Sequence, residues 1–158
     1  MTDTPMPQPG ETAPGFTLPR DGGDEVSLSD FAGKTVVLYF YPKDSTPGCT
    51  TEALDFTALA QDFADANAVV LGVSKDSVKK HDNFVAKQGL QVPLLSDQDS
   101  DTCERYGVWA EKKMYGKSFM GIVRATFLIG PDGTIARVWP KVKVAGHATE
   151  VLEAVRAL

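Results

Sequence analysis

Two runs of β-branched, aliphatic and aromatic residues stand out along the chain, Thr35–Tyr41 and Ala68–Val73. Neither run alternates apolar with polar positions, a pattern that predicts strands buried on both faces in the middle of a parallel sheet. Between them, from about Pro47 to Asp65, apolar side chains recur at helical spacing, so we expect one continuous helix there. A strand, a helix and a strand in this order cross over right-handed, and the two strands should therefore run parallel.

Weaker patterns predict the remaining elements. Phe16–Leu18 and Val26–Leu28 alternate apolar and polar residues around a glycine-containing turn, which predicts a short hairpin. Further along we expect, in order, a helix ending at Gly89, a strand Val92–Leu95, a short helix Asp99–Tyr106, a loop Ala110–Gly121, antiparallel strands Ile122–Ile129 and Thr134–Trp139, and a last helix His147–Leu158. This order predicts an α/β fold with a mixed central sheet flanked by helices and an N-terminal β-hairpin extension.

The length and the proline content divide the chain into two parts. The 158 residues suffice for one domain with its own hydrophobic core. Three prolines and a glycine within residues 1–11 interrupt any periodic pattern, and we expect a flexible N-terminal arm there. Residues 12–158 are expected to form the single domain.

Charge and composition exclude several classes of function. A net charge of −5 does not provide the basic surface that nucleic acid or anionic lipid attracts. The longest apolar runs fall far short of the ~20 residues that span a bilayer, and the N-terminus lacks the features of a signal peptide, so we expect a cytoplasmic protein. The two cysteines and two histidines are too scattered for a zinc motif, and no metal is expected.

The most informative segment is Thr46-Pro47-Gly48-Cys49, between the first buried strand and the first long helix. Thr46 suits the N-cap position and Pro47 the first helical position, which places Cys49 in the exposed first turn of the helix. The helix dipole and free backbone N–H groups favour a thiolate there. A lone cysteine is more often a small buried apolar residue. The cap sequence, the neighbouring glycine and the position beyond the carboxyl end of a strand favour a reactive thiol.

The spacing Pro42-x-x-x-Thr46-x-x-Cys49 resembles the active-site motif of the peroxiredoxins. The run YFYPKDSTPGCTTEALDF is similar to the bacterioferritin comigratory protein, or peroxiredoxin Q, branch, and later segments such as LLSDQDSDTCERYGVW and VRATFLIGPDG are similar to it in the same order. The resemblance implies a thioredoxin-like fold. It also implies a peroxidase that reduces hydrogen peroxide and organic hydroperoxides with no metal, haem or flavin cofactor. Thioredoxin, glutaredoxin or a small thiol would be the reductant.

The resemblance also assigns roles to four residues. Cys49 would attack the peroxide and become a sulfenic acid. Arg124 would hold its guanidinium near the sulfur, where it favours the thiolate and stabilises the charge that develops on the O–O bond. The Thr46 hydroxyl would bind the peroxide, and Pro42 would shield the thiolate from solvent. Three of these residues have a plainer alternative: Arg124 as a surface arginine on a strand edge, Thr46 as a helix cap and Pro42 as a strand terminator.

The chain departs from the branch at Leu54, where many members carry a second cysteine on the same helix. Cys103, the other thiol, is interpreted mainly as a buried packing residue and less readily as a resolving cysteine. Three routes for the sulfenic acid stay open: attack by an external thiol, a Cys49–Cys103 bridge after rearrangement, or a disulfide between chains. We favour the first, because two separate helices would have to move to bring the thiols together. We expect a monomer or a weak dimer.

Two other classes of function compete with a peroxidase. A thioredoxin-like disulfide reductase or isomerase needs a nearby second cysteine, and Cys49-Thr50-Thr51-Glu52 lacks it. A non-enzymatic binding domain that retains the cysteine is the other alternative. We interpret His81 as a partly buried neighbour of an apolar stripe, and His147 as a helix cap. Glu52 is an acid at a helix start, or a hydrogen-bonding partner within the site.

Overall fold

A five-stranded sheet forms the centre of the structure, a computed structural model that describes residues 5–158. Across the sheet the strands are β5 (Leu94–Ser96), β4 (Ala68–Ser74), β3 (Thr35–Phe40), β8 (Ala125–Ile129) and β9 (Ile135–Trp139). β3 pairs parallel with β4 and antiparallel with β8, and β8 pairs antiparallel with β9. The prediction of a mixed sheet built around a parallel βαβ unit is thus confirmed.

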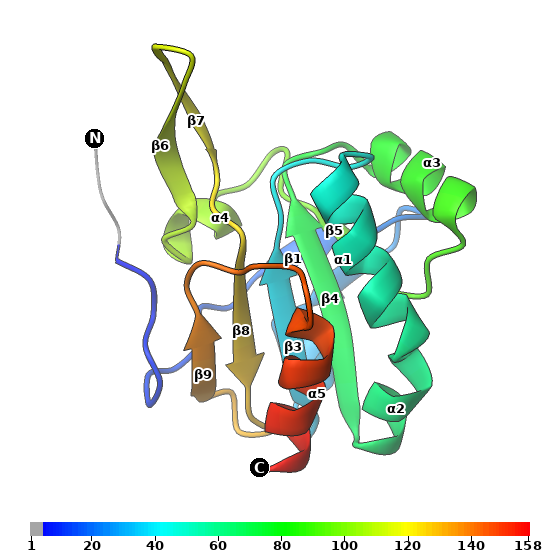
Figure 1. The fold of residues 1–158 in the computed structure, drawn as a ribbon. Helices are drawn as coiled ribbons and strands as arrows, with labels where there is room; N and C mark the ends of the chain where they lie inside the picture. Colours follow the sequence, from blue (N-terminus) through cyan, green and yellow to red (C-terminus); the bar gives the residue numbers. More distant parts are fainter. Residues whose placement is uncertain (1–4) are drawn as a thin grey trace.

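Every residue of β3 is buried, because both faces of the sheet are covered. Val37 and Tyr39 belong to one hydrophobic core, whereas Val36, Leu38 and Phe40 belong to the other. The first core lies under helices α1 (Pro47–Ala58), α2 (Ala60–Asp65), α3 (Val78–Gln88) and α5 (His147–Arg156), of which α1 and α5 lie side by side in front of the sheet (Figure 1). The second core lies under the N-terminal segment and α4 (Thr102–Arg105).

The N-terminal hairpin is confirmed as β1 (Thr17–Pro19) paired antiparallel with β2 (Glu25–Ser27), followed by the short 3-10 helix η1 (Leu28–Phe31). Within residues 5–11, the Gly10 N–H donates to the Ile135 carbonyl at 2.9 Å. The rest of the expected arm, residues 1–4, lies outside the described residues. Residues 5–158 contain no helix with both the length and the apolar character that crossing a bilayer requires.

The single helix predicted over Pro47–Asp65 is wrong, because the chain breaks it at Leu59 (φ −101°, ψ 8°). The Leu59 N–H donates to the Phe56 carbonyl at 3.1 Å, three residues back, which tightens and ends α1. The break lets Phe56 and Phe63, 0% and 1% exposed, enter the same core with ring centroids 5.9 Å apart. α4 is also shorter than the predicted Asp99–Tyr106 helix, with four residues.

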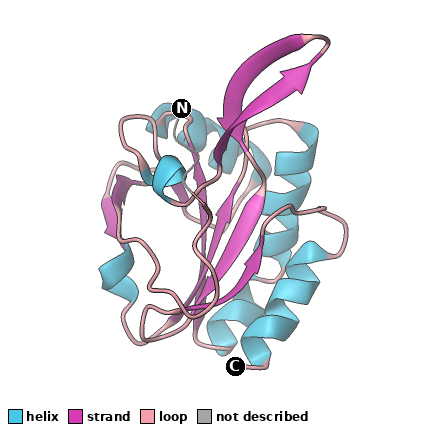
Figure 2. Cartoon of the chain, turned by 90° about the vertical axis from the view of Figure 1, so that its left-hand side faces the viewer, coloured by secondary structure: helices cyan, strands magenta, loops and turns pink. Residues whose placement is uncertain are grey.

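The loop predicted over Ala110–Gly121 is also wrong, because this segment forms a β-hairpin. β6 (Trp109–Met114) pairs with β7 (Lys117–Ile122) around a two-residue turn at Tyr115 and Gly116, both at positive φ (55° and 76°). Figure 2 shows the hairpin standing out from the body of the molecule. Most of its side chains are exposed on both faces, so it lacks the apolar alternation by which sequence predicts a strand. The predicted strand Ile122–Ile129 is therefore two strands, and Arg124 lies in the bend between them.

Candidate active site

The segment after β3 delivers Cys49 to the start of α1. Thr46 is the N-cap residue with an extended backbone (φ −85°, ψ 154°), and Pro47 occupies the first helical position, as the sequence predicts. The Thr50 N–H donates to the Thr46 carbonyl at 2.9 Å and closes the first turn. Pro47 and Gly48 are exposed, but Cys49 itself is only 2% exposed, so the expectation of an exposed side chain at this position is wrong. Its side chain faces the core of the α1–α5 side of the sheet.

Arg124 reaches this sulfur from the bend between β7 and β8. Its Nη2 atom lies 3.2 Å from Cys49 Sγ, and its Nη1 atom donates to Glu52 Oε1 at 2.6 Å. Cys49 and Glu52 are three residues apart on α1, which places both on one face of the helix. One guanidinium therefore bridges two side chains of the same turn. In the sequence analysis, Arg124 was assigned to the site only by the resemblance. Glu52 had two interpretations there, and the structure supports the one in which it is a hydrogen-bonding partner within the site.

Burial and neighbouring charges shift the pKa values of Glu52 and Arg124. Burial raises the pKa of Glu52 to about 7, although Arg124 pulls it down. Its second oxygen, Oε2, has no hydrogen-bond partner among residues 5–158, which makes the charged form costly. Burial alone would lower the pKa of Arg124, but Glu52 and the Cys49 sulfur together raise it. The guanidinium thus stays a cation beside the sulfur.

Thr46 and Pro42 lie in the loop that precedes the cysteine. Although Thr46 is the N-cap residue, its hydroxyl makes no capping bond and donates instead to the Lys43 carbonyl at 2.8 Å. Its oxygen keeps the capacity to accept a hydrogen bond. Pro42 lines a cavity of about 310 Å³ together with apolar hairpin side chains that include Trp109 and Phe119. The hairpin that the sequence missed therefore forms one wall beside the active-site loop.

Lys112 connects this hairpin with Arg124 electrostatically. It lines the same cavity, and burial lowers its pKa, with a further lowering by the charge of Arg124. Two cations therefore lie close enough to influence each other near the sulfur. Within residues 5–158, no three His, Cys, Asp or Glu side chains gather as metal ligands would.

Cys103 lies on the opposite side of the sheet. It belongs to the second core, whereas Cys49 belongs to the first, and it is 0% exposed. Burial raises the pKa of its thiol, and the nearby Asp97 carboxylate adds to that shift. Asp97 also accepts the Cys103 N–H at 2.7 Å, which holds the start of α4. Both cysteines are free thiols.

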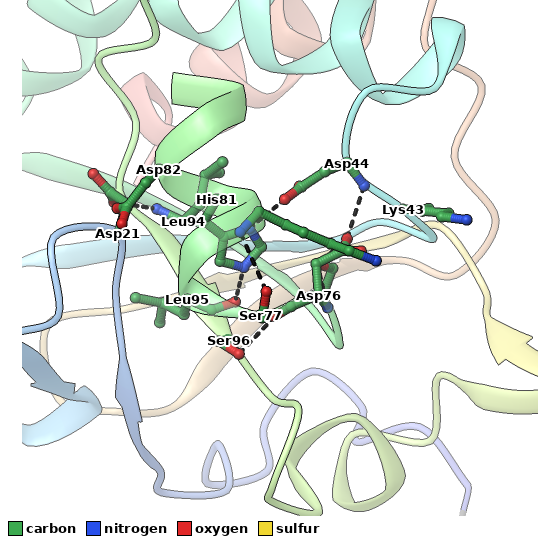
Figure 3. Close-up of polar contacts among 12 residues, drawn as sticks. Asp21, Lys43, Asp44, Asp76, Ser77, His81, Asp82, Leu94, Leu95 and Ser96 are labelled. Atoms are coloured by element: carbon green, nitrogen blue, oxygen red, sulfur yellow. Dashed lines mark hydrogen bonds and ion pairs between the residues drawn. The ribbon is translucent and has the colours of Figure 1, made fainter. Parts of the chain in front are cut away.

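A buried polar network next to the active-site loop escaped the sequence analysis (Figure 3). Asp44 accepts the Tyr41 hydroxyl at 2.6 Å and contacts His81 Nδ1 at 2.6 Å. His81 is fully buried on α3, where the sequence indicated only partial burial. The signal was a histidine at an apolar position of a helix and an aspartate just after a buried strand. His147, expected as a cap, instead contacts the Thr126 hydroxyl at 2.8 Å through Nε2, and burial lowers its pKa to about 4.

Comparisons with known proteins found relatives that match nearly the full length of the chain. The family model described as AhpC/TSA family matches residues 9–138. The chain is 54% identical over 159 residues to "Peroxiredoxin Bcp" of Xanthomonas campestris, covering 99% of this chain and 98% of that protein. A solved cysteine-to-serine variant of peroxiredoxin Q from Xylella fastidiosa superposes with a TM-score of 0.90 at 48% identity, covering 96% of both chains.

A second solved structure bears on chemistry. It is the bacterioferritin comigratory protein of Xanthomonas campestris, whose description concerns alkyl peroxide reduction and a trapped intermediate/ligand complex. It superposes with a TM-score of 0.87 at 52% identity and covers 98% of both chains. The similarity thus extends over nearly the whole length of both chains.

Proposed function

The chain belongs to the AhpC/TSA family, as a peroxiredoxin with a thioredoxin-like fold and thiol-dependent peroxidase activity, and from this premise we propose that Cys49 is the sulfur that peroxide oxidises. The observation that carries the proposal is the 3.2 Å contact between Arg124 Nη2 and Cys49 Sγ. A cation held this close favours the thiolate, which is the nucleophilic form of cysteine. For Cys103, in contrast, burial and the neighbouring Asp97 carboxylate raise the pKa of the thiol and so disfavour the thiolate.

In the oxidation step the Cys49 thiolate attacks the outer oxygen of the peroxide. An S–O bond forms and the O–O bond breaks, and its electron pair leaves on the other oxygen, which takes up a proton to become water or an alcohol. The sulfur is oxidised by two electrons to sulfenic acid. Arg124 stabilises the negative charge that moves along the O–O bond, and Glu52 holds the guanidinium in place.

Thr46 and Pro42 have supporting roles in this proposal. The Thr46 hydroxyl donates to Lys43, so the oxygen is free to accept a hydrogen bond from a protonated peroxide. Pro42 has no N–H group to bind water, and its ring forms part of the wall beside the loop. Both roles rest on the motif that these residues share with Cys49 in the sequence.

We propose that the substrates include organic hydroperoxides as well as hydrogen peroxide. The cavity beside Pro42 has the apolar side chains Trp109, Phe119, Met120 and Ile122 on the hairpin side, which suit an alkyl group. The alkyl peroxide reduction described for the Xanthomonas campestris relative supports the same class.

The reductant is proposed to be an external thiol, thioredoxin, glutaredoxin or a small thiol, acting directly on Cys49. Leu54 occupies the position of a second helical cysteine, and Cys103 lies in the core on the far side of the sheet. The external thiolate attacks the sulfenic sulfur and displaces hydroxide, which takes up a proton to become water. A second external thiol then cleaves the mixed disulfide, which restores the Cys49 thiol and leaves the two external sulfurs joined as a disulfide.

The remaining proposals concern the state of the protein. One domain over residues 12–158 is supported by two hydrophobic cores on either side of one sheet. A monomer or weak dimer is supported because Cys49, Arg124 and Glu52 come from one chain. A cytoplasmic protein is supported by two free thiols, which a reducing compartment maintains.

The proposal is tested with Cys49→Ser and, as the matched control, Cys103→Ser. Both variants remove one thiol from a buried site. Loss of hydrogen peroxide consumption with dithiothreitol in the first variant only, with both folded by circular dichroism, is the expected result. Persistent peroxidase activity in Cys49→Ser would assign the chemistry to another residue.

A further inference from the structure

The Asp44–His81 pair joins the active-site loop to α3 (Figure 3). The Tyr41 hydroxyl donates to the other oxygen of Asp44 at 2.6 Å. Both side chains are buried, at 4% exposure for Asp44 and 0% for His81. Asp44 lies in residues 42–46, the loop that joins β3 to the turn of Cys49. The mechanism proposed above uses neither residue, although a buried acid and a buried histidine are costly to maintain.

The hydrogen bonds fix how protons are arranged in the pair. His81 Nε2 lies 2.9 Å from the Leu95 carbonyl, which can only accept, so Nε2 carries a hydrogen. The 2.6 Å contact between His81 Nδ1 and Asp44 Oδ2 then holds one further proton, on either atom. The ring is therefore engaged at both nitrogens, and it joins the loop to the end of β5 as well as to α3.

Further bonds hold the same loop. The Asp44 N–H donates to Asp76 Oδ2 at 2.8 Å, and the Ser74 hydroxyl donates to the same oxygen at 2.8 Å. The next residue, Ser45, has a φ of 65°, in the left-handed region that a non-glycine residue rarely adopts. A backbone in this state persists only where its surroundings hold it. Asp44 therefore anchors the loop directly beside its strained residue.

The loop conformation matters because oxidation and reduction of Cys49 require different positions of its sulfur. Attack on peroxide needs the sulfur held against Arg124, as in the structure. Reduction needs an external thiol to reach a sulfur that is only 2% exposed, so the turn must open. A shift toward an open turn would therefore favour reduction of Cys49 and disfavour its oxidation.

We propose that Asp44 and His81 are positioning residues for the peroxidase reaction, which fix residues 42–46 and thereby hold Cys49 against Arg124. The inference rests on the proposed role of Cys49. Neither side chain donates to or accepts from Cys49 Sγ in the hydrogen bonds of residues 5–158, so they act through the loop. Weakening the pair should slow oxidation of Cys49 and speed reduction of its sulfenic acid.

The test compares three substitutions. His81→Ala removes both ring contacts, and Asp44→Ala removes the carboxylate. Asp44→Asn is the conservative variant, because its amide can donate to a neutral His81 Nδ1 while its oxygen still accepts the Tyr41 hydroxyl. Ile135→Ala, in the core on the other side of the sheet, is the control for a general loss of stability.

Two rates are measured in single turnovers at a temperature where every variant is folded. The first is oxidation by hydrogen peroxide, and the second is reduction of the sulfenic acid by dithiothreitol. Mass spectrometry first locates the oxidised sulfur. In the alanine variants we expect oxidation to slow by about tenfold or more, as a small misplacement of reacting groups costs at least that much. Reduction should accelerate by roughly fivefold, because the open state becomes more populated.

Asp44→Asn should return both rates to within about threefold of the natural protein. Ile135→Ala should change neither the oxidation rate nor the reduction rate. Tyr41→Phe, which removes one hydrogen bond and keeps the Asp44–His81 contact, gives a milder shift in the same direction and replaces Asp44→Ala if that variant fails to fold. Oxidation and reduction that fall together, or do not change, in His81→Ala would overturn the inference. Oxidation found at a residue other than Cys49 would instead overturn the proposed function.

Discussion

Arg124 Nη2 lies 3.2 Å from the sulfur of Cys49, although 75 residues separate the two in sequence. The Nη1 atom of the same guanidinium donates at 2.6 Å to Glu52, one helical turn beyond the cysteine. A planar cation with donors in a fixed fork can make both contacts at once. The position of the charge beside the sulfur therefore depends on the shape of the arginine as well as on its charge.

Arg124→Lys is expected to slow the oxidation of Cys49 by peroxide by about 100-fold, the loss typical when one group that stabilises transition-state charge is removed. The ammonium group is a point charge and cannot bridge Cys49 and Glu52 together. Competition with a second peroxidase of known rate measures the effect. Arg156→Lys, at a 3.8 Å exposed pair with Asp62, is the matched control. An unchanged rate in Arg124→Lys would show that charge alone suffices.

Gly48→Ala tests the same contact without removing any charge. A Cβ atom at residue 48 would lie 3.2 Å from Arg124 Nη2, closer than nine in ten real Cβ contacts. Since alanine favours a helix more than glycine does, the variant should be at least as stable as the natural protein. We expect the guanidinium to shift and peroxide oxidation to slow by about tenfold. Equal oxidation rates, alongside raised thermal stability, would mean that Arg124 adapts at no cost.

The sequence predicted the parts of the fold whose residues are buried on a regular period. Thr35–Phe40 and Ala68–Ser74 pair in parallel as their continuous apolar runs indicated. The loop predicted over Ala110–Gly121 is wrong, because a hairpin that stands in solvent has no buried face to impose an alternating pattern. The apolar spacing predicted a continuous helix, but the chain breaks it at Leu59. The break allows Phe56 and Phe63 to pack together in one core, a tertiary contact that the spacing does not reveal.

In the candidate site, too, the local features could be predicted from the sequence and the long-range contacts could not. Thr46-Pro47-Gly48-Cys49 is a local signal, because helix-capping chemistry lies within four consecutive residues. The contacts of Arg124 and His81 join elements far apart in the chain, and nothing in their own neighbourhoods specifies the partner. The resemblance supplied Arg124, whereas for His81 only the three-dimensional fold identifies Asp44 as the neighbour.

The raised pKa of Glu52 makes a prediction about stability. A carboxyl group whose pKa rises from 4.5 to about 7 on folding binds its proton more tightly in the folded protein. The stability it contributes is therefore present below pH 4.5 and is lost as the pH rises through about 7. Glu52→Gln mimics the protonated form and should remove this loss, on the order of 1–2 kcal/mol between pH 5 and pH 8.

Urea unfolding at both pH values measures this difference, in a Cys49→Ser background that removes the titration of the thiol itself. Glu111→Gln, at an exposed position of β6, serves as the control and should leave the pH dependence unchanged. A Glu52→Gln curve parallel to that of its parent would show that Arg124 keeps Glu52 ionised in the folded protein throughout this range.

The last prediction concerns the number of essential cysteines. Cys49 and Cys103 lie in hydrophobic cores on opposite faces of the central sheet, and Cys103 is 0% exposed. A disulfide needs Cα atoms within about 7 Å, so an internal bridge would require the chain on one side of the sheet to leave its core. We therefore expect Cys103→Ser to keep most of its peroxidase turnover with dithiothreitol. One equivalent of hydrogen peroxide should produce sulfenic acid at Cys49 with little internal disulfide.

The sulfenic acid has no partner thiol nearby, so excess peroxide should convert it readily to sulfinic acid. Leu54→Cys introduces a thiol five residues along the same helix, at a side chain that is 39% exposed. If the first turns of α1 can unwind, this variant should form an intramolecular disulfide and resist overoxidation. Leu54→Ser is the control, since serine is close to cysteine in size but cannot form a disulfide. Mass spectrometry of peroxide-treated protein distinguishes these products. A predominant Cys49–Cys103 disulfide in the natural chain, with Cys103→Ser stalled after one turnover, would make Cys103 the resolving residue and α4 a segment that must unfold in every cycle.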